Sequence, residues 1–174
     1  MSRNRLFGMA AMQQQTTPAP PPVQPSRQQP VPAEMMKDPK YGVASEIAAL
    51  PAARLTAILM DPQASVYARA KACQRLAVVG DKSAVPALAP LLNDSHLSLY
   101  ARTALETIPD RAADDALRTA LGKVQGKLLA GVINSIGKRR DTNAIGALEK
   151  LRHSAEFEVA DSANAALARI RPPL

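Results

Sequence analysis

A repeated phrase constrains the fold of this chain more than any other feature of its sequence. Residues 53–72, "ARLTAILMDPQASVYARAKA", align with residues 86–105, "PALAPLLNDSHLSLYARTAL", at an offset of 33. The offset superposes leucines, an aspartate and a Tyr-Ala-Arg triplet: Leu55 on Leu88, Leu59 on Leu92, Asp61 on Asp94, and 67–69 on 100–102. Self-similarity at a period of about 30 residues is typical of chains built by stacking small helical units.

Two looser copies follow. Leu88 aligns with Leu117 and then with Leu148, at spacings of 29 and 31. Each copy predicts a leucine-striped first helix and an Ala-rich second helix, because apolar residues recur every three or four positions. We expect the second helices at 65–79, 97–108, 127–137 and 156–170, and a short lead-in helix near 44–50. Pro90 should kink its helix unless that helix ends early, since proline lacks the N–H that the next turn needs.

Neither helix of such a unit can bury its apolar stripe alone, so neighbouring units have to share a core. The sequence therefore predicts an all-α domain over residues 43–174, a right-handed α-solenoid of about four helical hairpins. Composition agrees, because 47% of the residues are hydrophobic but only 3% are aromatic and none is Trp. The apolar content is Ala and Leu, which lead the helix-propensity scale.

The phrases "DPQASVYARAKA" (61–72), "DSHLSLYARTAL" (94–105) and G-D-x-x-A-x-x-A-L-x-x-L-L (80–92) resemble the HEAT-repeat family. The likeness is to its short bacterial units, also seen in phycobilin lyase-type repeats, and covers roughly residues 50–170. It implies a ladder of Asp–Arg contacts between repeats. Arg69 and Arg102 match the arginine of the repeat, and the third and fourth units lack it, so the resemblance implies the ladder in the first half of the domain.

The N-terminal region has a different composition. Seven of residues 13–32 are Pro, and none is acidic. Such a segment cannot bury enough apolar surface to offset its ordering entropy, so residues 1–42 are predicted to be a disordered, polyproline-like arm. Residues 22–27 match P-x-x-P-x-R, which leaves a plain linker and a docking motif both open. The start "MSRNRLFGMAAM" resembles a short signal sequence without a clear cleavage site, so we expect a cytoplasmic protein, with secretion as the alternative.

Candidate catalytic and metal-binding residues have simpler structural interpretations. Asp81, Asp110 and Asp141 recur at the turn before each first helix, where an aspartate caps free N–H groups. His96 and His153 fall in loops without the converging ligands that a metal needs. Adjacent Asp114 and Asp115 point about 100° apart on a helix. The single cysteine, Cys73, is expected to lie in the hydrophobic core. We therefore predict no enzymatic activity, cofactor or metal, and no apolar run approaches the length of a membrane span.

The net charge of +7 is distributed unevenly, with ten basic and five acidic side chains in residues 116–174. Base-stacking aromatics are scarce, so solvated surface or an acidic protein partner is favoured over nucleic acid or anionic lipid. We predict a non-catalytic protein-interaction scaffold or subunit of a larger assembly. The alternatives are a chromophore-lyase-like accessory protein and nucleic-acid or anionic-surface binding through the basic C-terminal half. The candidate contact residues are Arg69, Arg75, Arg102, Glu106, Asn134, Lys138, Arg139 and Arg140.

Overall fold

The computed structural model describes residues 36–171, and this part of the chain is mostly helical. It opens with a short antiparallel hairpin, β1 (Lys37–Asp38) and β2 (Gly42–Val43). The α-helices within residues 36–171 are α1 (Ala44–Ala48), α2 (Ala52–Met60), α3 (Val66–Val79), α4 (Val85–Leu88), α5 (Ser98–Thr107), α6 (Arg111–Ala120), α7 (Gly126–Arg139), α8 (Ile145–Leu151) and α9 (Phe157–Ile170). Three 3₁₀ helices lie among them: η2 (Lys82–Ala84), η3 (Ala89–Asn93) and η4 (Thr142–Ala144). The predicted all-α class is confirmed.

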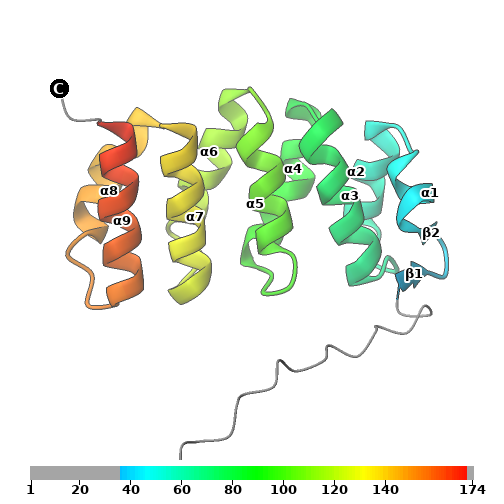
Figure 1. Cartoon of the computed structure of the whole chain (residues 1–174), viewed down its shortest axis with the longest axis horizontal. Helices are drawn as coiled ribbons and strands as arrows, with labels where there is room; N and C mark the ends of the chain where they lie inside the picture. Colours follow the sequence, from blue (N-terminus) through cyan, green and yellow to red (C-terminus); the bar gives the residue numbers. More distant parts are fainter. Residues whose placement is uncertain (1–35, 172–174) are drawn as a thin grey trace, which may run out of the picture. The chain divides into compact units, whose positions relative to one another are not determined.

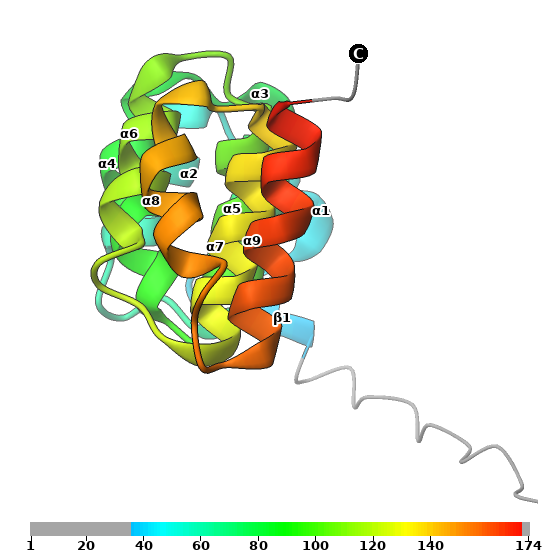
Figure 2. The same cartoon turned by 90° about the vertical axis from the view of Figure 1, so that its left-hand side faces the viewer.

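The helices are arranged in two layers (Figure 2). One layer holds α2, α4, α6 and α8, and we call it the first-helix layer. The other holds α3, α5, α7 and α9, which stand side by side with α1 next to α3 (Figure 1). We call it the second-helix layer. Each helix of the second layer packs on the helix before it in the chain and on its neighbours in its own layer.

A single hydrophobic core lies between the layers. The first-helix layer supplies mostly leucines and the second-helix layer adds many alanines, so the helices approach closely. The largest fully buried side chains are Ile47, Leu55, Ile58, Leu76, Leu88, Leu92, Leu97, Leu105, Ile108, Leu117, Ile133 and Ile136. Cys73 is part of this core, and burial raises the pKa of its thiol to about 12. A thiol in that environment stays protonated and does not act as a nucleophile.

Pro90 changes the first helix of the second pair. The α-helix stops after Leu88, and the chain continues as the 3₁₀ helix η3. Proline has no N–H to donate, so the α-helical hydrogen bond that would end at residue 90 cannot form. Pro86, in the first turn of α4, is tolerated because that position needs no donor. The α-helix therefore ends early, two residues before Pro90.

The β1–β2 hairpin belongs to the helical unit. The Asp38 carboxylate accepts a 2.9 Å hydrogen bond from the Ser65 N–H at the start of α3. The Asp61 carboxylate accepts from the Tyr41 hydroxyl at 2.6 Å and from the Lys40 ammonium at 2.8 Å. Contacts between β1 and α3 add to these bonds. The helical unit therefore begins before residue 43, where the sequence had placed its boundary. The predicted Pro-rich arm and signal-like start fall mainly in residues 1–35, outside the described residues.

Candidate interaction surfaces

The three recurring aspartates are N-caps: Asp110 caps α6, and Asp81 and Asp141 cap the 3₁₀ helices η2 and η4 that lead into α4 and α8. Asp81 accepts a hydrogen bond from the Ser83 N–H at 2.8 Å, Asp110 from the Ala112 N–H at 2.8 Å, and Asp141 from the Asn143 N–H at 3.0 Å. Hydrogen bonds from Ser83 lower the pKa of the Asp81 carboxyl. Asp141 has a second role, because its other carboxylate oxygen binds the Arg118 guanidinium.

The histidines and adjacent aspartates singled out in the sequence do not gather into one cluster within residues 36–171. No group of three or more His, Cys, Asp or Glu side chains in this part of the chain is placed to hold a metal ion. His96 and His153 are exposed in loops. Asp114 binds Arg139 and Asp115 binds Arg118, so the adjacent carboxylates each have a separate basic partner.

The two arginines of the repeat make different contacts. Arg69 donates to the Asp61 carbonyl inside its own hairpin, at 2.6 Å. Arg102 reaches from α5 to α7, where it donates to the Gly131 carbonyl at 3.0 Å and to the Ser135 hydroxyl at 3.3 Å. Gly131 stands one repeat after Arg102, and a Cβ there would lie 2.7 Å from the Arg102 Cζ atom. Burial lowers the pKa of the Arg102 guanidinium.

Arg69 and Arg102 thus do not form the Asp–Arg ladder that the HEAT resemblance implied. Neither forms an ion pair with an aspartate in residues 36–171. The Asp–Arg pairs lie in the second half, where Arg118–Asp141 joins successive hairpins and Arg139–Asp114 joins the two helices of one hairpin. The expectation of a ladder in the first half is wrong, because the two guanidiniums meet backbone carbonyls and a serine instead.

Polar side chains connect α5, α7 and α9 across the second-helix layer. The Ser135 hydroxyl donates to the Glu106 carboxylate at 2.7 Å, and the Lys138 ammonium lies 3.0 Å from the other oxygen of Glu106. Asn134 continues the connection to α9 through Ser162 at 3.3 Å. Glu106, Asn134 and Lys138, proposed from the sequence as partner contacts, are therefore already bonded to neighbouring helices.

Arg139 differs most from its expected role as surface charge. Only 10% of its side chain is exposed. It donates to the carbonyls of Leu105 at 2.8 Å and Ile108 at 2.7 Å, and to Asp110 at 3.1 Å. It also pairs with Asp114 on α6. Since the last carbonyls of a helix have no partner within that helix, Arg139 completes the C-terminal end of α5 from α7.

Arg140 and Arg75 are the remaining sequence candidates. Arg140 is exposed and ends α7 in the left-handed conformation, with φ 53° and ψ 40°. Arg75 is half-buried and lines a shallow pocket between α1 and α3, with Lys71 and Gln74. Of the candidate residues, Lys138 and Arg140 are the exposed ones, and the others are half-buried.

A groove between α3 and α5 was not anticipated from the sequence. Its volume is about 450 Å³, and Tyr67 and Tyr100 line it from equivalent positions of the two best-matched repeats. The other lining residues are Met36, Val66, Ala70, Lys71, Gln74 and His96, and we call this the tyrosine groove. Met36 is 49% exposed and Val66 is 48% exposed. The Tyr-Ala-Arg triplet repeats in the sequence, but the repeat alone does not indicate that its two tyrosines line one groove.

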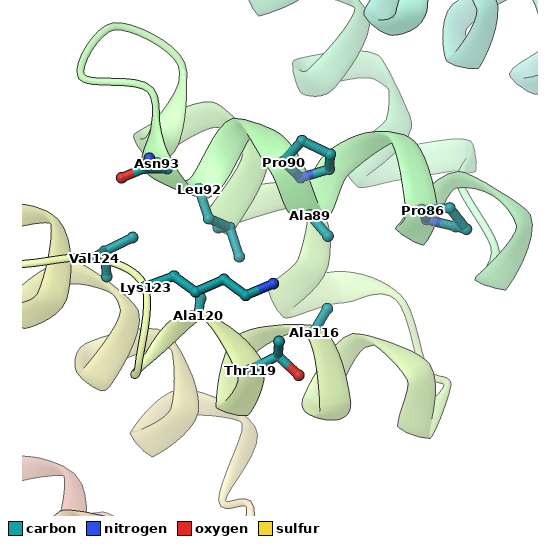
Figure 3. A pocket seen from close by; sticks show the side chains of 10 residues that line it. All are labelled: Pro86, Ala89, Pro90, Leu92, Asn93, Ala116, Thr119, Ala120, Lys123 and Val124. Carbon is teal, nitrogen blue, oxygen red and sulfur yellow. The ribbon is translucent and has the colours of Figure 1, made fainter.

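A second hollow lies in the first-helix layer, between η3 and α6, with a volume of about 520 Å³ (Figure 3). Its walls are mainly proline rings and small or aliphatic side chains, and we call it the proline pocket. It is lined by Pro86, Ala89, Pro90, Leu92, Asn93, Ala116, Thr119, Ala120, Lys123 and Val124.

No protein-family model and no curated protein matches this chain. Among the helices of residues 36–171, none is both long enough and apolar enough to cross a membrane.

Proposed function

We propose that the helical unit is a short right-handed α-solenoid of the HEAT type that binds a protein partner without catalysing a reaction. Four consecutive helical hairpins with one shared core support the solenoid reading. The HEAT part of the proposal is supported by the resemblance of the repeated sequence phrases to that family.

The tyrosine groove carries the functional part of this proposal. Tyrosines and exposed aliphatic residues that line one hollow are the composition of an interface centre rather than of ordinary surface. Tyrosine adds a hydroxyl that can bond a partner while its ring is buried. The groove is open to solvent at Met36 and Val66, so these side chains remain available.

The basic residue of the groove indicates the chemistry of the partner. The Lys71 ammonium lies 5.6 Å from the centre of the Tyr67 ring, and no ion pair within residues 36–171 involves it. A protein segment with an apolar anchor side chain and a neighbouring carboxylate would fit both features. Nucleic acid has less support, because Arg139, in the middle of the basic run 138–140, is directed inward.

Affinity purification tests the proposal, with the full chain as bait and extracts of its source cells. Val66→Lys should abolish capture of the specific partner, since it places a charge in the apolar groove. Val78→Lys is the matched control, because Val78 lies on the same helix, is 74% exposed and does not line the groove. Equal capture by wild type and Val66→Lys would refute the assignment of the groove.

The arm should be tested separately by deleting residues 1–35. A longer deletion would remove Asp38 and Lys40, whose bonds hold the β1–β2 hairpin to α2 and α3. Loss of capture after the shorter deletion would assign binding to the arm, whereas retained capture would assign it to the helical unit.

A further inference from the structure

The proline pocket exists because the first helix of the second pair is interrupted. The α4 helix ends at Leu88, two residues before Pro90, and the narrower 3₁₀ helix η3 begins at Ala89. The facing helix α6 presents small side chains at Ala116 and Ala120, which cannot fill the space that remains (Figure 3). The pocket therefore follows from the backbone and from residue size, and it does not depend on a displaced flexible side chain.

The pocket offers an apolar surface of fixed shape. Leu92, Ala120 and Val124 are buried core residues that form part of its lining, at 1%, 5% and 4% exposure. The rings of Pro86 and Pro90 add rigid walls. A volume of about 520 Å³ lies within the range of pockets that bind small molecules, which are concave, mostly apolar and largely preformed.

Lys123 gives the pocket a charge. Its side chain extends across the hollow, and its ammonium points toward Ala89 and Ala116 (Figure 3). Within residues 36–171 no carboxylate pairs with Lys123, and no acidic residue lines the pocket. Asn93 and Thr119 provide additional hydrogen-bonding groups. An apolar hollow with one unpaired cation selects a ligand that combines a hydrocarbon group with one negative charge.

We propose that the proline pocket binds an acyl-chain carboxylate, with the hydrocarbon chain between η3 and α6 and the carboxylate on the Lys123 ammonium. This goes beyond the proposed protein-binding function and is independent of it. The tyrosine groove lies in the second-helix layer, and the two hollows share no lining residue.

Dodecanoate, kept below its critical micelle concentration, is the direct probe. Titration into the ¹⁵N-labelled full chain should shift the amide signals of η3 and α6 saturably. Dodecylammonium of equal chain length should bind at least tenfold more weakly, because its charge repels Lys123. Shortening the acid from twelve to ten carbons should weaken binding roughly tenfold, if both lost methylenes were buried.

Two substitutions and two matched controls locate the site. Lys123→Met keeps the aliphatic stem and removes the charge, and it should weaken dodecanoate binding roughly fivefold. Lys150→Met, at an exposed lysine of α8 outside the pocket, should leave affinity unchanged. Ala116→Leu should fill the hollow and abolish binding. Ala147→Leu is its control, because Ala147 stands one repeat later at an exposed position of α8.

Far-ultraviolet circular dichroism checks that each variant is folded. If Ala116→Leu does not fold, the affinity of Lys123→Met for dodecanoate tests the site. Saturable shifts confined to η3 and α6, with the charge preference described, would support the proposal. It is overturned by absence of shifts, by equal binding of dodecanoate and dodecylammonium, or by shifts centred on Tyr67 and Tyr100. The last result would place apolar ligands in the tyrosine groove instead.

Discussion

The junction between α3 and α5 and the junction between α5 and α7 use different chemistry. Within the described residues, no side-chain hydrogen bond or ion pair joins α3 to α5. The tyrosine groove lies on the surface between these two helices. The second junction is joined by Arg102, Glu106, Ser135, Lys138 and Arg139. Polar groups bonded to a neighbouring helix stabilise the fold and leave few free donors. We therefore expect substitutions at the α5–α7 junction to lower stability, and substitutions at the α3–α5 junction to affect the proposed partner binding.

Arg139→Met should have the largest effect, about 3 kcal/mol less free energy of unfolding. It leaves Asp114 without its partner and removes the donor to the last carbonyls of α5. Urea denaturation followed by circular dichroism measures the loss. Arg140→Met is the neighbouring control, and it should change stability by less than about 0.5 kcal/mol, because that side chain is exposed. Equal effects of the two substitutions would remove the distinction between the junctions.

Gly137→Ala should cost about 2 kcal/mol, because the added Cβ would lie 2.8 Å from the Ala166 Cα atom. The two nearest atoms are the Cα and Cβ of Ala166, which cannot rotate away, so α7 and α9 would have to separate. Gly146→Ala on α8 is the control, since a Cβ there meets nothing within 4 Å. It should gain up to about 1 kcal/mol from helix propensity. Thermal and urea unfolding measure whether each variant gains or loses free energy of unfolding. A gain in Gly137→Ala would contradict the close packing of α7 on α9.

The caps Asp81 and Asp141 should differ although the sequence treats them alike. Asp141→Ala should cost about 2 kcal/mol, because it removes both a cap and the ion pair with Arg118. Asp81→Ala should cost less, since it removes a cap alone. Asp81→Asn should preserve stability and partner capture, because asparagine also caps helices. Partner loss in Asp81→Asn with unchanged stability would make Asp81 a functional residue.

Acid should weaken the bonds that hold the β1–β2 hairpin to α2 and α3. Hydrogen bonds from Lys40 and then from Tyr41 lower the pKa of Asp61 below its ordinary 3.8. At Asp38 burial acts to raise the pKa, but hydrogen bonds from Ser65, Lys40 and Tyr41 outweigh it and lower the pKa.

A carboxyl whose pKa is lower in the folded state contributes stability above its unfolded pKa and loses it as the pH falls. The hairpin contribution should thus be complete above about pH 5 and decline below about pH 4. Amide hydrogen exchange of Ser65 follows the release. Exchange that does not change between pH 6 and pH 3, after correction for the intrinsic rate, would contradict this prediction.

The helical pattern could be read from the sequence because it depends on local periodicity. The spacing of Leu88, Leu117 and Leu148 places one buried leucine in the first helix of each of three successive pairs. Pro90 left either a kink or an early end open in the sequence, and the structure shows the early end. The role of Arg139 could not be read, because its partners are the backbone carbonyls of Leu105, Ile108 and Asp110, which carry no mark in a sequence.

The surfaces were harder to predict than the helices. A basic run at 138–140 looks uniform in one dimension, but the helix directs Arg139 inward and leaves Lys138 and Arg140 exposed. The tyrosine groove needs Tyr67 and Tyr100 from two repeats and Met36 from outside the repeats. Such hollows depend on how neighbouring units pack, which periodicity alone does not specify.

The most direct test is a parallel affinity purification with Val66→Lys and Lys138→Met as baits beside the wild type. Val66 represents the α3–α5 junction, and Lys138 is the exposed member of the α5–α7 network, with 61% of its side chain accessible. The account predicts that Val66→Lys loses the partner and that Lys138→Met retains it. Retention by Val66→Lys together with loss by Lys138→Met would contradict the account and return binding to the basic end of α7.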